Sequence, residues 1–295
     1  MRRGGGVNPL GWALRSIPLG PLQPLKNVAG SPVEGQRILV TGASSGVGEA
    51  TARQLAAKGA EVWLVARRLE ELQRVATEIE AAGGSARVST CDLSDLEQVD
   101  ALVAEVLEAG GVDVLVNNAG KSIRRSLELS FDRFHDFERM MAINYFGPVR
   151  LTMGLLPSMI ERGDGHVVNV LTWGVQGLAP KFAAYTAAKA ALDAFGRIAS
   201  RELRHQGVTV TNVRLDLVRT PMIAPTDAFD NRPARSPEGA ARMLVRACED
   251  RPPEVNTLLG TLGAISGMVA PRVSDLSWNA VDRQLPDSKA ARGDR

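Results

Sequence analysis

The sequence predicts an α/β fold in which helices cover both faces of one parallel sheet, and two observations support this prediction. Short runs rich in β-branched residues alternate with longer segments of helical period. The first run leads into Thr41-Gly-Ala-Ser-Ser-Gly-Val-Gly48, after which an alanine-rich helical pattern continues to Lys58. This alternation is typical of a doubly wound parallel sheet. A chain of 295 residues with 44% hydrophobic content can bury one large core, so we expect a single domain.

Six runs have the length and composition of strands, and the segments between them have the period of helices. The predicted strands span residues 37–40, 61–65, 86–91, 112–117, 166–171 and 208–213. In such a sheet, ligands bind beyond the carboxyl ends of the strands. Each predicted strand is followed by a candidate ligand-binding segment, namely residues 41–48, 66–68, Asp92, 117–120, Thr172 and 215–220. We therefore expect six segments to converge on one crevice.

The glycine-rich segment after the first strand has the pattern of a dinucleotide-binding turn. Gly42 allows a tight turn, Gly46 lets the backbone approach a pyrophosphate, and Gly48 lets the following helix pack closely on the strand. The N-terminus of that helix offers unpaired N–H groups to phosphates. A glycine cluster alone is weak evidence, but two further motifs follow it in the chain.

These two motifs are Asn117-Asn-Ala-Gly120, after another buried strand, and Tyr185-Thr-Ala-Ala-Lys189, on a later helical segment. Tyr185 and Lys189 are four residues apart, so they lie on one face of the helix. An ammonium near a phenol favours the phenolate, and we expect Lys189 to lower the pKa of Tyr185. Tyr185 can then act as an acid in reduction and a base in oxidation. A tyrosine and a lysine at this spacing are usually just neighbours on the solvated face of a helix. Here the glycine turn and the 117–120 motif favour a catalytic role for them.

With these three motifs in order, the chain resembles the short-chain dehydrogenase/reductase family from about residue 35 to residue 222. The spacing TGxxxGxG is that family's variant of the dinucleotide-binding turn. The resemblance implies a Rossmann-like fold and one nicotinamide-dependent redox site per subunit. The positions that it implies for cofactor contacts are Gly42, Ser44, Ser45, Gly46, Val47, Gly48, Asp92, Leu93, Asn118, Ala119, Gly120, Tyr185, Lys189, Val218 and Thr220.

The resemblance also implies four catalytic residues, which are Asn144, Thr172, Tyr185 and Lys189. Lys189 is expected to hold the ribose hydroxyls of the cofactor, and Asn144 to support a water relay to Lys189. Thr172 stands where the family typically has a serine. Its hydroxyl can donate the same hydrogen bond to a substrate carbonyl, whereas its extra methyl crowds the site. We expect activity with an altered rate or substrate fit, and a degenerate site remains the alternative.

A second departure from the family lies at Leu215-Asp216, where many members have Pro-Gly. Val218 and Thr220 retain the rest of that motif, which touches the nicotinamide amide. Asp216 is either a solvated turn residue or a carboxylate beside the nicotinamide, where it would favour the oxidised ring.

The end of the second strand indicates which nicotinamide cofactor is used. Enzymes selective for NAD typically have an acid there, whereas this chain has Ala66 followed by Arg67 and Arg68. Two guanidiniums can bracket a 2′-phosphate, so NADP(H) is favoured. A solvated pair is the alternative, although cations at a helix N-terminus oppose the helix dipole. Asp92 either lies near the adenine, as in the family, or caps the following helix.

The substrate prediction rests on a nearer resemblance, to the reductase domain of actinobacterial fatty acyl-CoA reductases. It is carried by Arg124-Arg-Ser-Leu, Phe131-Asp-Arg-Phe-His-Asp-Phe-Glu138, Arg219-Thr-Pro-Met-Ile-Ala-Pro-Thr226 and Leu285-Pro-Asp-Ser288. It implies an NADPH-dependent reduction of a fatty acyl-CoA or fatty aldehyde. A ketone or secondary-alcohol dehydrogenase for another lipid-like substrate, and a protein that binds NADP without turnover, remain alternatives.

Three basic residues after the 117–120 motif are candidates for contact with the anionic end of a coenzyme A ester. They are Lys121, Arg124 and Arg125, and a solvated charge run is the alternative interpretation.

We expect three regions: a flexible leader over residues 1–34, an NADP-binding domain over 35–250 with a substrate lid near 223–237, and a C-terminal extension over 251–295. The leader has no acidic residue before Glu34, and its apolar stretch is too short and broken to span a bilayer. Within the extension, residues 255–268 are apolar and rich in glycine, so they either cover the substrate site or touch lipid. Peripheral membrane contact is the alternative for the leader and the extension.

Composition excludes several other classes of function. A net charge of +2 without a basic stripe argues against nucleic-acid binding. The two cysteines, Cys91 and Cys248, have no CxxC spacing, which fits a reducing cytosol. The histidines, His135, His166 and His205, show no ligand spacing, and we expect no metal. The alanine-rich face over residues 183–199 suits a homo-oligomer interface, or alternatively the intramolecular core.

Overall fold

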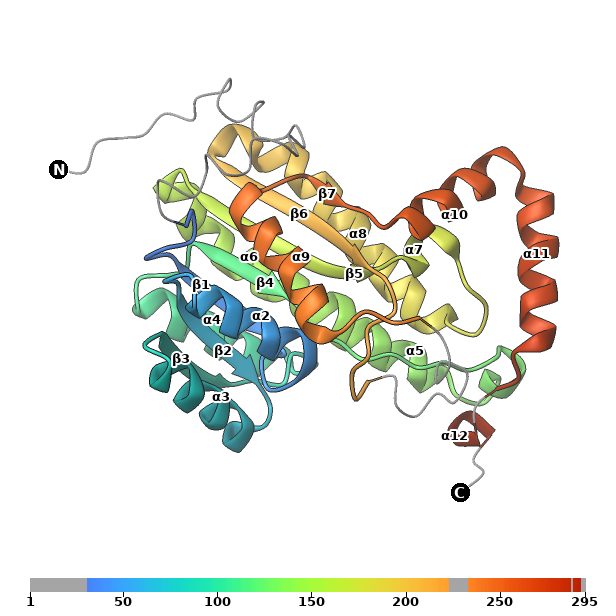
Figure 1. The fold of residues 1–295 in the computed structure, drawn as a ribbon, viewed down its shortest axis with the longest axis horizontal. Coiled ribbons are helices and arrows are strands. Elements are labelled where there is room, and N and C mark those ends of the chain that lie inside the picture. The colour runs from blue at the N-terminus through green and yellow to red at the C-terminus, as the bar shows by residue number, and fades with distance from the viewer. Residues whose placement is uncertain (1–30, 223–232, 288, 293–295) are drawn as a thin grey trace.

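The computed structural model describes residues 31–222, 233–287 and 289–292 of the chain (Figure 1). Its centre is a seven-stranded sheet of order β3-β2-β1-β4-β5-β6-β7, in which all neighbours are parallel. The strands are β1 (Arg37–Thr41), β2 (Glu61–Ala66), β3 (Ser85–Thr90), β4 (Val114–Asn117), β5 (Gly165–Thr172), β6 (Val208–Leu215) and β7 (Glu254–Val255). The strand order reverses between β1 and β4, which is where a doubly wound sheet opens a binding crevice.

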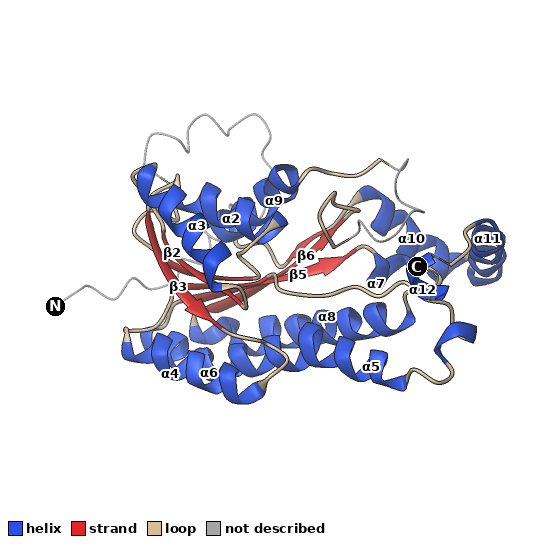
Figure 2. Ribbon diagram, turned by 90° about the horizontal axis from the view of Figure 1, so that it is seen from below, coloured by secondary structure: helices blue, strands red, loops and turns tan. Residues whose placement is uncertain are grey.

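Helices cover both faces of the sheet (Figure 2). On one face lie α2 (Gly46–Ala56), α3 (Leu69–Ala81) and α9 (Pro237–Asp250). On the other face lie α4 (Leu96–Glu108), α5 (Phe134–Met141), α6 (Gly147–Arg162) and α8 (Ala183–Leu203). Shorter helical segments are η2 (Glu128–Ser130), η3 (Ala142–Phe146), α7 (Gly174–Gly177) and η4 (Arg204–Gln206). This is the predicted three-layer architecture in a single domain.

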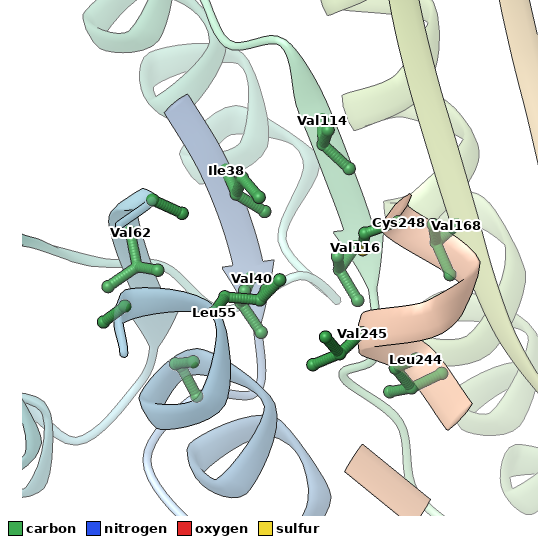
Figure 3. Packing of buried hydrophobic residues seen from close by; sticks show 14 of the residues in the cluster. Ile38, Val40, Leu55, Val62, Val114, Val116, Val168, Leu244, Val245 and Cys248 are labelled. Carbon is green, nitrogen blue, oxygen red and sulfur yellow. The ribbon is translucent and has the colours of Figure 1, made fainter. Parts of the chain in front are cut away.

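The two layers of helices enclose two hydrophobic clusters, one on each face of the sheet. One cluster joins Ile38 and Val40 of β1 to Leu55 of α2 and Leu244 of α9 (Figure 3). The other joins Leu39 of β1 to side chains of α4 and α6 such as Leu102 and Leu151. Because β1 is buried on both faces, the turn that follows it stands on a closely packed strand.

All six predicted strands form, with ends that differ by one or two residues from the predicted ones. The sequence pattern missed β7, which has only two residues and pairs with β6. Residues 1–30 of the predicted leader and residues 223–232 of the predicted lid lie outside the described part of the chain.

The C-terminal extension forms α10 (Leu258–Val269), α11 (Pro271–Gln284) and α12 (Lys289–Arg292). In Figure 1, α10 and α11 extend away from the sheet beyond α7. Gly260 is the one buried residue of α10, and α11 has none. In the described ranges, no helix has the length and apolar character that a membrane span requires.

Candidate active site

The carboxyl ends of the strands open into one cleft of about 1840 Å³. It brings together every residue that the sequence predicted for the site. These are Gly42, Ser44, Ser45, Gly46, Val47, Gly48, Arg67, Arg68, Asp92, Leu93, Asn118, Ala119, Gly120, Asn144, Thr172, Tyr185, Lys189, Val218 and Thr220. The convergence of separate chain segments on one crevice is thus as the sequence predicted.

The glycine turn between β1 and α2 has no room for side chains at two of its glycines. Gly42 has a φ of +69°, and a Cβ atom there would lie 2.9 Å from the Cα atom of Ala119. A Cβ atom on Gly48 would lie 2.2 Å from the carbonyl oxygen of Gly42. The helix therefore packs directly on the turn, for the reason predicted. Ser45 precedes α2 without a side-chain cap bond, so the N–H groups of the first helical turn stay open to an anion.

Thr41 links this turn to the loop after β4, a role that the sequence reasoning missed. Its hydroxyl accepts hydrogen bonds from the backbone N–H groups of Asn118 and Ala119, both at 3.0 Å. The hydroxyl donates to the Val116 carbonyl at 3.2 Å. The Asn118 side-chain amide donates back to the Thr41 carbonyl at 2.8 Å. A threonine at the end of a buried strand was the available signal, but only its neighbours in space show what it binds.

Lys189 and Asn144 converge beside Gly120. A Cβ atom on Gly120 would lie 2.7 Å from Asn144 Oδ1 and 3.3 Å from Lys189 Nζ. Lys189 is buried, and its Nζ donates to the Val170 carbonyl at 2.9 Å. The Asn144 amide donates to the Lys121 carbonyl at 2.9 Å, while its Oδ1 accepts from the Lys121 N–H at 3.3 Å. Gly120 therefore leaves open the space into which both polar groups point.

Asn144 is placed by a turn of π-helix, η3, between α5 and α6. Such π-turns insert an extra residue into a helix and often occur at functional sites. Asn144 is fully buried there, and its amide also donates to the Met140 carbonyl at 3.1 Å. The sequence indicated the asparagine by resemblance, but not the helical distortion that brings it beside Gly120.

Tyr185 lies beside Thr172, and the hydroxyl groups of the two side chains share a hydrogen bond. Thr172 Oγ1 also accepts from the Gly174 N–H at 3.1 Å. Burial raises the pKa of Tyr185 to about 12, and the Thr172 contact opposes this only in part. Burial lowers the pKa of Lys189 to about 8. The prediction that Lys189 lowers the pKa of Tyr185 is therefore not met here, because burial of the phenol is the largest influence on its pKa and the Thr172 hydroxyl alone opposes it.

The two arginines after β2 both lie at the rim of the cleft. Arg68 reaches the glycine turn, where its Nη2 donates to Ser44 Oγ at 3.3 Å. Arg67 is largely exposed and lies 3.5 Å from the Asp92 carboxylate. Asp92 accepts from the Ser94 N–H at 3.0 Å, and its pKa is lowered because hydrogen bonds to Ser94 and the Arg67 charge outweigh partial burial. Asp95 caps α4, so the capping role considered for Asp92 is wrong.

Asp216 forms an ion pair with Arg235, Nη2 to Oδ2 at 3.0 Å. It is thus not a freely solvated turn residue. It also lines the cleft, and its place beside the nicotinamide stays a prediction. Val218 forms an isolated β-bridge with Arg235, and the Thr220 hydroxyl donates to the Val218 carbonyl at 3.4 Å. These contacts hold the segment after β6 against residues 233–235.

Two of the three basic residues after the 117–120 motif have structural partners. Arg124 is buried and donates to the carbonyls of Leu285 and Pro286 at 3.1 and 2.9 Å. Arg125 pairs with the buried carboxylate of Asp136. The solvated interpretation is wrong for both, since Arg124 is buried and Arg125 is paired with a buried carboxylate. Arg124 also lines the cleft, and contact with a coenzyme A ester stays a prediction. Lys121 is exposed at the cleft.

The other end of the cleft is lined by apolar side chains that come mostly from beyond residue 255. They include Trp173, Leu258, Leu259, Trp278, Val281 and Leu285. The sequence indicated a cover from residues 255–268, but missed the contribution of α11. Among the described residues there is no cluster of His, Cys, Asp and Glu suited to a metal ion.

Comparisons with known proteins agree with this geometry. The family model for short chain dehydrogenases matches residues 36–231. A fatty acyl-CoA reductase of Acinetobacter baylyi is 46% identical over 264 residues, which cover 89% of this chain and 90% of that protein. A fatty acyl-CoA reductase of Mycobacterium tuberculosis is 47% identical, with 87% of this chain and 92% of that protein covered.

Among solved structures, a metagenomic short-chain oxidoreductase in complex with NADP is 34% identical, with a TM-score of 0.66. The match covers 76% of this chain and 97% of that one. The family match, the parallel sheet and the grouping of the motif residues in one cleft agree with one another. The chain belongs to the short chain dehydrogenase family and is an oxidoreductase of that family.

Proposed function

We propose that this protein uses NADPH to reduce the carbonyl of a hydrophobic substrate, a fatty acyl-CoA or a fatty aldehyde. The observation that carries the proposal is the position of Tyr185 and Thr172. They lie between a cofactor end built from the glycine turn and an apolar end built from the C-terminal extension. Two fatty acyl-CoA reductases share 46% and 47% identity with this chain, which supports the substrate class.

The residues at the cofactor end fit a phosphorylated dinucleotide. The open N–H groups at the start of α2 and the close turn at Gly42 suit a pyrophosphate. Arg67 and Arg68, with no acid at the end of β2, suit a 2′-phosphate. Lys189 suits the ribose hydroxyls, and Val218 and Thr220 suit the nicotinamide amide. NADPH, when bound, supplies the hydride that reduces the substrate carbon.

The protein's own part in the reaction is to orient the carbonyl and to supply a proton. The Thr172 hydroxyl orients the carbonyl oxygen, and the Tyr185 hydroxyl donates its proton to that oxygen as the carbon gains the hydride. With an aldehyde this gives the alcohol, whereas with an acyl-CoA it gives a thiohemiacetal, whose C–S bond then breaks to release the coenzyme A thiol and the aldehyde. Burial raises the pKa of Tyr185 to about 12, so the phenol holds its proton at neutral pH, as a proton donor must. The same shift makes the phenol a weaker acid, so the proton moves only as negative charge develops on the carbonyl oxygen. Lys189 and Asn144 face the same space beside Gly120, and we assign to them the supply of a replacement proton to Tyr185.

We also propose that the protein forms a homo-oligomer and contacts a lipid surface, and two groups of exposed apolar side chains support this. Phe146, Met153 and Ile198 leave apolar area exposed near or on α6 and α8, which supports a homo-oligomer through these helices. The alanine-rich face of α8 is divided, because Ala188 and Ala199 are in the core whereas others face out. The exposed apolar side chains of α10 and α11 support peripheral contact with a lipid surface.

The test is NADPH oxidation by the purified protein with a long-chain acyl-CoA, the matching aldehyde and a panel of hydrophobic ketones. Turnover of the acyl-CoA or the aldehyde is the expected result. Turnover of ketones alone would replace the proposal with a ketone reductase. NADPH binding without any turnover would point to a protein that only binds the cofactor.

The cofactor preference has its own test in the variant Arg67→Ser/Arg68→Ser. Each charge-assisted hydrogen bond to a phosphate contributes about 1.5–3 kcal/mol, so the loss of both should raise the KM for NADPH by about 100-fold or more. The KM for NADH should change little. Equal changes for both cofactors would contradict a 2′-phosphate site at these arginines.

A further inference from the structure

The outer wall of the apolar end of the cleft is formed by one side of α11. Its partly buried residues are Ser274, Trp278, Val281 and Asp282, followed by Leu285 just after the helix. Their spacing of three and four residues places them on one helical stripe, and four of the five line the cleft. The opposite side of α11 is exposed, with Val273 and Leu276 facing away from the protein.

This wall meets the catalytic residues through a pair of tryptophans. Trp173 directly follows Thr172, and its indole ring stacks on that of Trp278 with centroids 6.1 Å apart and planes inclined by 26°. Both rings line the cleft. An extended apolar group whose carbonyl meets Thr172 and Tyr185 would therefore have the aromatic pair beside it.

The wall is held by individual contacts rather than by burial in the core. Lys181, a buried ammonium on the loop after α7, pairs with the carboxylate of Asp282. The same Nζ also donates to the Asp282 carbonyl at 3.3 Å. Lys181 has a left-handed backbone with a φ of +66°, which non-glycine residues adopt at a cost. Its carbonyl accepts from the Arg125 N–H at 2.7 Å, so the loops after β4 and β5 meet at the residue that holds α11.

Further contacts fix the chain just after α11. Arg124 donates to the Leu285 and Pro286 carbonyls, and the Ser126 N–H donates to the Asp287 carboxylate at 2.8 Å. At its other end the wall continues into α10, where Gly260 and Gly263 let the helix approach α7 closely. The wall is thus joined to the two loops that carry Gly120 and Thr172.

We propose that the cleft-facing side of α11, and Trp278 above all, is the specificity-determining surface for the apolar chain of the substrate. The Lys181–Asp282 ion pair positions this surface against Trp173. A long chain lies along Trp278, Val281 and Leu285, while a short chain ends before it reaches them. This inference rests on the proposed function in one respect, because it requires a substrate with an apolar chain.

The test compares Trp278→Ala with Leu276→Ala, a control on the exposed side of the same helix. For hexadecanal, Trp278→Ala should raise the KM by about tenfold or more and leave kcat within twofold, since the loss of buried contact acts on binding of the chain. For butanal, the KM should change by less than twofold. Leu276→Ala should match the wild type with both aldehydes.

Equal changes in KM for both aldehydes, or no change for either, would overturn the proposal. The positioning role of Lys181 is tested by Asp282→Asn, which keeps the size of the side chain and removes its charge. It should raise the KM for hexadecanal less than Trp278→Ala does, with butanal unaffected. A fall in kcat for both aldehydes would instead mean that the ion pair supports the catalytic loop.

A second readout separates this inference from the proposed function. The fluorescent fatty acid cis-parinaric acid should bind the wild type and Leu276→Ala equally and bind Trp278→Ala about tenfold more weakly. If no fatty substrate is turned over but this binding pattern is found, the proposed reaction fails and the apolar surface stands. If turnover is found but all three proteins bind the probe alike, the surface fails and the reaction stands.

Discussion

The two ends of the cleft are built in different ways. At the cofactor end, the glycine turn stands on β1, whose central side chains Ile38, Leu39 and Val40 are fully buried. At the substrate end, α10 and α11 leave most of their apolar side chains in solvent, including Leu258 and Met268, which are 77% and 79% exposed. Core packing fixes the first end, whereas a small number of side-chain contacts fixes the second. We therefore expect that cofactor binding and substrate choice can be changed separately in this chain.

The largest expected effect is a loss of activity at Tyr185, where the two ends of the cleft meet. Tyr185→Phe removes the proton donor, so kcat for reduction should fall by about 10³-fold, the range typical of a lost general acid. The dissociation constant for NADPH should stay within a few-fold of the wild type. The only other tyrosine, Tyr145, serves as the matched control, and Tyr145→Phe should keep kcat. Comparable rates for the two variants would remove Tyr185 from the mechanism.

The next prediction compares the effect on stability of a methyl group added at the cofactor end of the cleft with that of one added at the substrate end. In Gly48→Ala the new Cβ would lie 2.2 Å from the Gly42 carbonyl oxygen, so the turn must shift. We expect a loss of about 3 kcal/mol in the free energy of unfolding and weaker NADPH binding. In Gly267→Ala the Cβ of α10 meets nothing within 4 Å, and a gain of up to about 1 kcal/mol is expected. Urea denaturation measures both, and equal losses would contradict the contrast.

A third comparison concerns two ion pairs. Arg214, on β6, is buried between Asp193, at 2.5 Å, and Glu254, at 2.9 Å. Arg214→Met leaves the Asp193 carboxylate buried without its partner and should cost about 3 kcal/mol of unfolding free energy. Lys181→Met should cost about 1 kcal/mol or less, because Asp282 is partly exposed and α11 adds little to the core. A larger cost for Lys181→Met would mean that the substrate end is part of the cooperative core.

The last prediction is a pH dependence of stability that comes from the packed core. Burial lowers the pKa of His166 to about 3, so the unfolded state takes up a proton near pH 6.5 and the folded state does not. Stability from this group is therefore present above about pH 6.5 and falls as the pH falls toward 3, by about 2 kcal/mol at pH 5. Urea denaturation at pH 7 and pH 5 should show a smaller difference for His166→Gln than for the wild type. The exposed-site control, His205→Gln, should keep the wild-type difference.

The same contrast explains what the sequence could predict. The strands, the glycine turn and the Tyr185–Lys189 pair follow local rules of period and spacing, so the fold and the cofactor end were readable. Thr41 could not be assigned, because its partners come from a loop more than seventy residues away. The raised pKa of Tyr185 depends on burial, which no spacing reports.

At the substrate end, sequence reasoning found less. Arg124 and Arg125 were interpreted either as contacts for a coenzyme A ester or as solvated charges, yet one binds carbonyls after α11 and the other a buried carboxylate. The stripe that includes Trp278 and Asp282 has the period of an ordinary amphipathic helix, so nothing in it indicated which surface it would face. Only the tertiary contacts with Trp173 and Lys181 show that it lines the cleft.

The most direct test of this two-part construction is amide hydrogen exchange on the whole protein without ligand, read by mass spectrometry. Core elements open only by global unfolding, whereas elements held by a few contacts open locally at a much lower free energy. We expect amides of β1 and β4 to exchange at least about 10³-fold more slowly than those of α11, relative to their intrinsic rates. Equal protection of α11 and the central strands would contradict the account, because it would make the substrate end part of the same rigid core.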